Sequence, residues 1–133
     1  GQILTSGGTG VAPTFQAAAA GGADTSLSNL SATGEQRVCQ AWVRFNGTGT
    51  IAIHDSHNVN SLTDNGTGNY NVNLDQSMAN AFYSVSALAH QTVNSDERIR
   101  LNGTTTGSFE LNNLSGDNVK HDTTNICAQV FGD

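Results

Sequence analysis

The sequence has few charged residues, almost no proline and no long apolar run. Of 133 residues, 12% are charged, with five basic against eleven acidic side chains, and one residue is proline. The basic residues do not cluster, so a surface that neutralises nucleic-acid phosphates is not expected. No apolar run reaches the roughly 18 residues of a transmembrane helix, and no signal-peptide pattern occurs. We therefore expect neither nucleic-acid binding nor membrane insertion.

Cysteine is also scarce, with only Cys39 and Cys127. Two cysteines without CxxC spacing do not make a zinc site. A disulfide between them would close a long loop, whereas two thiols would be small buried side chains in a protein assembled in a reducing cytoplasm. We favour the thiols. Because the chain opens on Gly1 rather than Met, we also expect a fragment of a longer protein.

Short alternating apolar segments, separated by Gly, Asn, Asp and Ser, fill most of the chain. In residues 38–45 and 69–74, for example, every second side chain is apolar or small. This pattern is typical of an antiparallel β-sandwich or a small barrel-like sandwich. We predict an all-β head domain over residues 37–133. Residues 1–36 have too little apolar area to fold alone and are predicted to be an extended or linker segment, with short strands near Leu4 and Phe15.

The tetrapeptide Asn-Gly-Thr-Gly occurs twice, starting at Asn46 and Asn65, and a relative, NGTTTG, starts at Asn102. All three lie between strand candidates, where Asn and Gly tolerate the positive φ of tight turns. Each also fits the N-x-S/T glycosylation sequence, but no secretory route is indicated. The strands after the two copies share only their alternation, which argues against an internal repeat. We predict hairpin turns.

The densest group of reactive side chains is His-Asp-Ser-His, residues 54–57. Alternate residues of a strand face opposite sides, so Asp55 and His57 share one face with Ile51 and Ile53, and a Ser–His–Asp relay within the strand is excluded. If three chains met on a three-fold axis, Asp55 and His57 would be able to bind a metal ion. Otherwise they are ordinary polar strand residues. We predict no catalytic residue, no cofactor and no enzymatic activity.

Trp42 shares its predicted strand face with Gln40 and Arg44. A tryptophan on a polar face can stack on a sugar ring or pack against another sheet or subunit. Packing is the simpler interpretation and ligand stacking is the alternative. The candidate ligand-binding residues are Trp42, Arg44, His54 and Tyr70.

Two stretches resemble virion proteins. GQILTSGGTGVAPTFQ, at residues 1–16, resembles a segment of bacteriophage tail-fibre and other virion proteins with the form G-Q-x-L-T-S-x-G-x-x-x-x-P-x-[WF]-x. The run from CQAWVRFNGTG through SHNVNSLTDNGTGNYNVN is similar to a module of phage fibre and appendage proteins. Related modules often carry a basic and an aromatic residue where this chain has His54 and His57.

This resemblance implies an all-β virion component that forms an intertwined homotrimer, with an extended N-terminal segment. It implies the distal, host-recognising domain of a tail fibre, assembled in the host cytoplasm, with other virion proteins and host-surface polysaccharide as partners. The alternatives are a capsid-decorating (cement) or fibre-shaft trimer without a ligand and, last, a polysaccharide hydrolase. A hydrolase would need two carboxylates about 5–10 Å apart, and the sequence does not indicate such a pair.

Overall fold

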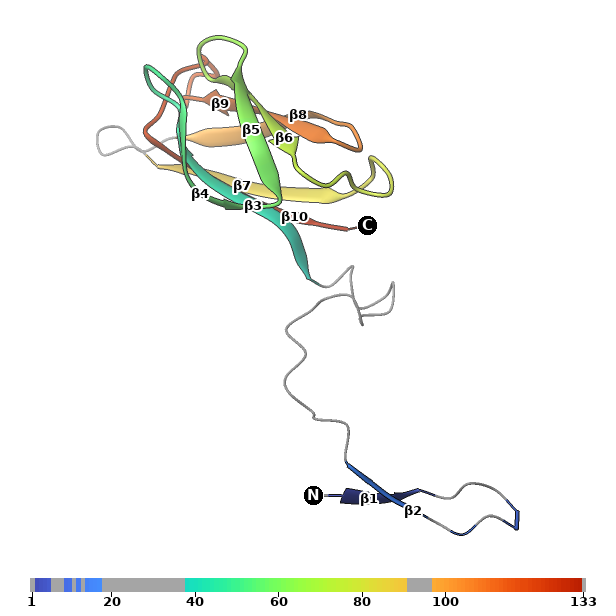
Figure 1. Ribbon diagram of the computed structural model, residues 1–133. Coiled ribbons are helices and arrows are strands. Elements are labelled where there is room, and N and C mark those ends of the chain that lie inside the picture. Colours follow the sequence, from blue (N-terminus) through green and yellow to red (C-terminus); the bar gives the residue numbers. More distant parts are fainter. Residues whose placement is uncertain are drawn as a thin grey trace. The chain divides into compact units, whose positions relative to one another are not determined.

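The computed structural model describes residues 2–5, 9–10, 12, 14–17, 38–90 and 97–132. The chain forms two units, Gly1–Leu30 and Ser31–Asp133. In the first unit, β1 (Gln2–Thr5) pairs antiparallel with β2 (Thr14–Ala17) (Figure 1). The two short strands predicted there are confirmed. The predicted linker falls mainly on residues 18–37, which lie outside the described residues.

The second unit consists of two four-stranded antiparallel sheets (Figure 1). Sheet 1 has the order β4-β3-β10-β7, and sheet 2 has the order β5-β6-β9-β8. The strands are β3 (Cys39–Asn46), β4 (Ala52–His57), β5 (Val59–Asp64), β6 (Asn69–Leu74), β7 (Ser84–His90), β8 (Arg98–Thr104), β9 (Ser108–Leu114) and β10 (Asn125–Phe131). The predicted all-β, antiparallel architecture is confirmed. In the described parts of the chain, no helix is long and apolar enough to span a membrane.

Alternating side chains from both sheets form one core. In β3, β6 and β10 every second residue is buried, as the sequence pattern predicts. The rings of Phe45 from sheet 1 and Tyr70 from sheet 2 meet edge to face, with centroids 5.3 Å apart. Full burial of each large apolar side chain stabilises the fold by about 1.5–3 kcal/mol. The fully buried large apolar side chains are Phe45, Phe109, Leu111, Ile126, Val43, Val72 and Val130, together with Tyr70.

Strand β4 interrupts its alternation at His54. Arg44 lies opposite Asp55, but the next residue, Phe45, lies opposite Ile53, so His54 is the extra residue of a β-bulge. The bulge places Asp55 on the outer side with Arg44, while Ile53, which is 36% exposed on this edge strand, lies opposite the core residue Phe45. The predicted common face for Asp55 and Ile53 is therefore wrong, because alternation along the sequence does not account for the extra residue.

Asn58 carries the chain from sheet 1 to sheet 2. It lies between β4 and β5 with φ at 53°, a left-handed conformation that asparagine tolerates better than most residues. Its side-chain amide donates to the carbonyls of Gln40 and Gln76, each at 3.2 Å, and its Oδ1 accepts from the Gln76 N–H at 2.6 Å. These bonds hold three chain segments together at the corner of the sandwich.

Candidate functional site

The side of sheet 1 that points away from the core collects most of the predicted site residues. Trp42 on β3 lies opposite His57 on β4 and Gln129 on β10. Arg44, two residues along, lies opposite Asp55 and Cys127 in the same way. We call this surface the outer face of sheet 1; its members are Gln40, Trp42, Arg44, Asp55, His57, Ser86, Leu88, His90, Asn125, Cys127 and Gln129.

Trp42 is half-buried at the middle of this face. The predicted pairing of Trp42 with Arg44 on one side of β3 is confirmed, because the alternate residues Ala41 and Val43 are in the core. Among the described residues, none forms a hydrogen bond with the indole N–H of Trp42. The ring therefore offers an apolar surface and an unused donor beside the polar side chains of His57 and Gln129.

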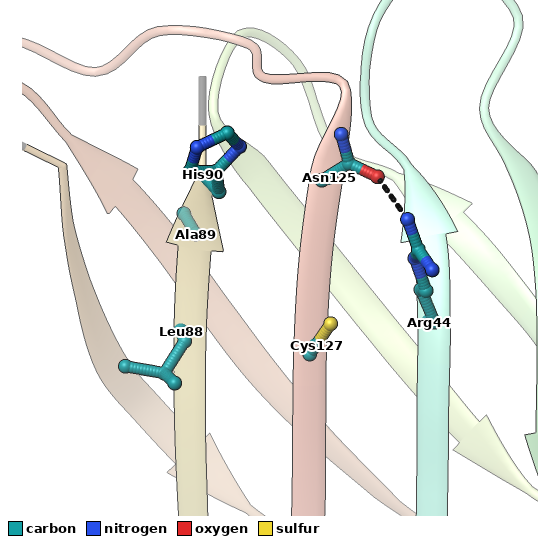
Figure 2. A pocket seen from close by; sticks show the side chains of 6 residues that line it. All are labelled: Arg44, Leu88, Ala89, His90, Asn125 and Cys127. Atoms are coloured by element: carbon teal, nitrogen blue, oxygen red, sulfur yellow. Dashed lines mark hydrogen bonds between the residues drawn. The ribbon is translucent and has the colours of Figure 1, made fainter. Parts of the chain in front are cut away.

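A hollow of about 300 Å³ opens beside Arg44 on the same face. Figure 2 shows Arg44 on one side, Leu88 and His90 on the other, and Cys127 and Asn125 between them on β10. Arg44 Nη2 donates to Asn125 Oδ1 at 3.0 Å. Leu88 is 75% exposed, so the hollow has an apolar wall as well as a charged one.

The sequence prediction missed His90 and Asn125 as members of this site. Asn125 is the first residue of β10. Alternation along this strand places its side chain on the side away from the core, since the next residue, Ile126, is buried. That β10 lies between β3 and β7, however, depends on pairing between segments far apart in the chain. His90 is the exposed last residue of β7 and lies opposite Asn125.

Asp55 and His57, the predicted metal ligands, are both exposed on the outer face of sheet 1. Asp55 Oδ1 accepts a hydrogen bond from the Ser56 N–H at 2.9 Å. Within the ranges that the structure covers, no three His, Cys, Asp or Glu side chains come together in a possible metal site. A site shared by three chains stays a prediction. His54, a candidate ligand residue, is exposed in the bulge of the edge strand β4.

Tyr70 is the predicted ligand residue that the structure contradicts. Its side chain is fully buried, because the alternation of β6 places it in the core with Val72 and Leu74. Its hydroxyl lies 2.9 Å from the Gly47 carbonyl and 2.9 Å from Asp122 Oδ1. Burial, and then the Asp122 carboxylate, raises the pKa of this hydroxyl. Tyr70 is thus a structural residue that stays protonated.

Both Asn-Gly-Thr-Gly turns form hydrogen bonds close to the Tyr70 hydroxyl. The Gly47 N–H of the first turn donates to the Thr123 carbonyl at 2.9 Å, and the Gly68 N–H of the second donates to Asp122 Oδ1 at 2.7 Å. We call this group the turn junction, made of Gly47, Gly68, Tyr70, Asp122 and Thr123. The prediction of hairpin turns is confirmed for both copies, since they connect β3 to β4 and β5 to β6.

The third relative, at Asn102, behaves differently. Asn102 and Gly103 lie inside β8, where the register shifts between Leu101 and Gly103, and the turn follows near Gly107. The motif spans residues 102–107, so the predicted hairpin turn is confirmed, but only its last three residues, 105–107, form the turn between β8 and β9, because residues 102–104 extend the strand.

Two further sets of reactive side chains are the Glu97–His121 pair and the two cysteines. Glu97, whose side chain is 3% exposed, lies with Oε2 3.0 Å from His121 Nε2. The His121 side chain is 30% exposed, so this contact joins a buried carboxylate to a partly exposed imidazole. Cys39 and Cys127 are free thiols, as favoured from the sequence, but Cys127 is exposed rather than buried because its neighbours Ile126 and Ala128 occupy the core side.

Comparison of the chain with protein-family models, curated proteins and solved structures finds no significant match. The function therefore has to be argued from the sequence motifs and from the geometry of the outer face of sheet 1.

Proposed function

We propose that this chain is the host-recognising domain of a bacteriophage tail fibre, a homotrimer that attaches the virion to a glycan on the cell surface. The two sequence stretches that resemble fibre and virion proteins suggest the setting. The observation that carries the binding function is Trp42, an aromatic ring held on a sheet face among side chains that retain unused hydrogen-bonding groups.

The composition of the outer face of sheet 1 supports a sugar ligand. Protein sites for small ligands combine apolar and aromatic surface with a few polar groups that fix orientation. Here Trp42 and Leu88 supply the apolar surface, and Arg44, His57 and Gln129 supply donors and acceptors. The strands of sheet 1 contain one carboxylate, Asp55, and so lack on this face the carboxylate pair that glycoside hydrolysis commonly uses. Binding without catalysis is the proposed activity.

The test is a glycan array with the full chain, followed by competition between the soluble chain and phage for adsorption to host cells. Trp42→Ala is expected to lower glycan binding at least about tenfold, in line with an aromatic anchor. Phe82→Ala is the matched control, because Phe82 is an aromatic side chain that is 95% exposed outside the proposed surface. Equal loss in both variants, or no glycan binding by the unaltered chain, would contradict the proposal.

A structural trimer of the capsid or fibre shaft is the second candidate, and one observation favours it. Leu88 is 75% and Val119 is 60% exposed, and large exposed apolar side chains often mark contacts between subunits. The mass of the protein in solution tests the trimer that both candidates share, and a stable monomer would contradict both. Specific attachment to capsids, with no effect on host adsorption, would favour decoration over host recognition.

A further inference from the structure

The hollow beside Arg44 has more donors than the described side chains use. A guanidinium group has five N–H donors, and the hydrogen bond from Arg44 Nη2 to Asn125 Oδ1 engages one of them. Side-chain nitrogens of His90, on the far side of the hollow, have no hydrogen-bond partner among the described residues. A ligand that enters the hollow therefore meets Arg44 N–H groups that need acceptors, and a His90 ring that has hydrogen-bonding groups to spare.

The direction of Arg44 is the second observation. Arg44 lies opposite Asp55 in the β3–β4 register, yet in the described part of the chain Arg44 forms no ion pair. Its guanidinium is held instead by Asn125 on β10, the neighbouring strand on the other side. Figure 2 shows this side chain directed toward Asn125 at the edge of the hollow. The charge of Arg44 is thus kept away from the nearest carboxylate of its own sheet.

Charge is distributed unevenly over the molecule, and this distribution favours binding of an anion in the hollow beside Arg44. The chain as a whole has a formal net charge of −6. The strands of sheet 1, in contrast, contain one carboxylate, Asp55, against Arg44 and the three histidines of β4 and β7. Arg44 is the one side chain of these strands with a permanent positive charge, and it borders the hollow.

The geometry points to a carboxylate-bearing sugar as the ligand of this hollow. We infer that a uronic or nonulosonic acid residue of the glycan places its carboxylate on Arg44, in the planar two-bond arrangement that guanidinium groups favour. The exposed apolar side chain of Leu88 receives the C–H side of the same residue. At about 300 Å³ the hollow lies at the lower end of ligand pockets, so one sugar residue enters. This inference rests on the proposed glycan-binding function and gives that ligand its chemical class.

The experiment uses the full chain and an array of acidic glycans, each printed beside its carboxyl-reduced counterpart. The two forms differ only in whether a sugar residue ends in a carboxylate or an alcohol. Binding to the acidic form is expected to exceed binding to the reduced form by about tenfold or more, the size of a charge-assisted hydrogen bond. It should also weaken as NaCl is raised, because the site is open to solvent.

Arg44→Gln is expected to abolish the preference for the acidic forms. Arg100→Gln is the matched control, since Arg100 is also an exposed arginine but lies on β8 of sheet 2, opposite Asn112. Its preference should equal that of the unaltered chain. Inorganic sulfate, added as a competitor, should displace acidic glycans far less well than free glucuronate does.

The outcomes separate this inference from the proposed function. Trp42-dependent binding with equal signals for acidic and reduced glycans would overturn the acidic ligand and leave glycan recognition standing. Equal loss of preference in Arg44→Gln and Arg100→Gln would overturn the assignment to the hollow, and competition by sulfate as strong as by glucuronate would overturn the carboxylate. Absence of binding to every glycan would overturn both proposals.

Discussion

The turn junction and the outer face of sheet 1 use similar side chains in opposite ways. In the junction, the Asp122 carboxylate accepts from the Gly68 N–H and lies within hydrogen-bonding distance of the Tyr70 hydroxyl, and the Tyr70 side chain is fully buried. On the outer face, Arg44 makes one hydrogen bond and Trp42 is half-buried. The difference between the two regions lies in unused hydrogen-bonding capacity at an accessible surface rather than in residue type, and this capacity is what supports the proposed binding function.

This comparison predicts that substitutions in the turn junction lower the unfolding free energy, whereas substitutions on the outer face of sheet 1 leave it nearly unchanged. Gly68 and Gly49 provide the sharpest test, because both end an Asn-Gly-Thr-Gly turn with φ at +61°. A Cβ on Gly68 would lie 2.7 Å from the Asn113 carbonyl oxygen and 2.7 Å from the His121 nitrogen, while a Cβ on Gly49 would meet nothing within 4 Å. Gly68→Ala should cost about 2–5 kcal/mol of unfolding free energy, from left-handed strain and overpacking together.

Gly49→Ala is the control for that variant. It retains the backbone strain without the clash, and should cost only about 1–2 kcal/mol. Urea denaturation of the two variants measures the difference. Equal losses would mean that the crowding at Gly68 is relieved by movement of the 113–121 segment, and the junction would then not be rigid.

Removal of the Tyr70 hydroxyl should have the next largest effect. Tyr70→Phe removes the one O–H donor that the Gly47 carbonyl and the Asp122 carboxylate share, which should lower the unfolding free energy by about 1–3 kcal/mol. Thermal or urea unfolding gives the value. A change within error would show that water replaces the hydroxyl, contrary to the burial of this side chain.

Alkaline pH should weaken the fold through its buried tyrosines. Burial raises the pKa of Tyr83 to about 12, and burial with the Asp122 carboxylate raises the pKa of Tyr70 as well. An unfolded tyrosine ionises near pH 10, so the unfolded chain loses these protons first. The stability contributed by the neutral rings is complete below about pH 10 and is lost as pH rises toward the folded pKa.

The measurement is the urea midpoint between pH 8 and pH 11. We expect a decline that begins near pH 10 and is clearly smaller in the Tyr70→Phe, Tyr83→Phe double variant, compared with its own value at pH 8. An identical decline in both proteins would assign alkaline destabilisation to other groups.

The smallest effect is expected on the outer face of sheet 1. Arg44 is exposed, and Arg44→Gln should change the unfolding free energy by less than about 0.5 kcal/mol. Differential scanning calorimetry checks this against Arg100→Gln. A loss as large as that of Tyr70→Phe would erase the contrast between the two regions and give Arg44 a structural role.

The sequence predicted the local features of the fold well. The alternation of β3 and β6 identified core residues such as Val43 and Val72, because period-two burial is decided within one strand. The Asn-Gly-Thr-Gly turns were predictable for the same reason. Pairing between distant strands was not, so neither the strand order nor the bulge at His54 followed from the pattern.

The candidate site was predictable only in part, for the same physical reason. Trp42 and Arg44 share a side of one strand, and that follows from alternation. Their neighbours Asn125 and His90 come from β10 and β7, which the chain brings alongside through long-range pairing. Tyr70 shows the converse error: its aromatic and polar character suggested a ligand contact, but its place on the core side of β6 decides its role.

The position of β10 has a consequence for how the protein is made. β10 lies between β3 and β7, yet it is the last of these strands to leave the ribosome. Until residues 125–131 emerge, β3 and β7 each present an unpaired edge, a state prone to association with other nascent chains. Every row of side chains on the outer face of sheet 1 crosses β10. Translation that stops before Asn125 therefore leaves β3 and β7 without the strand that pairs with both, and the proposed binding surface unformed.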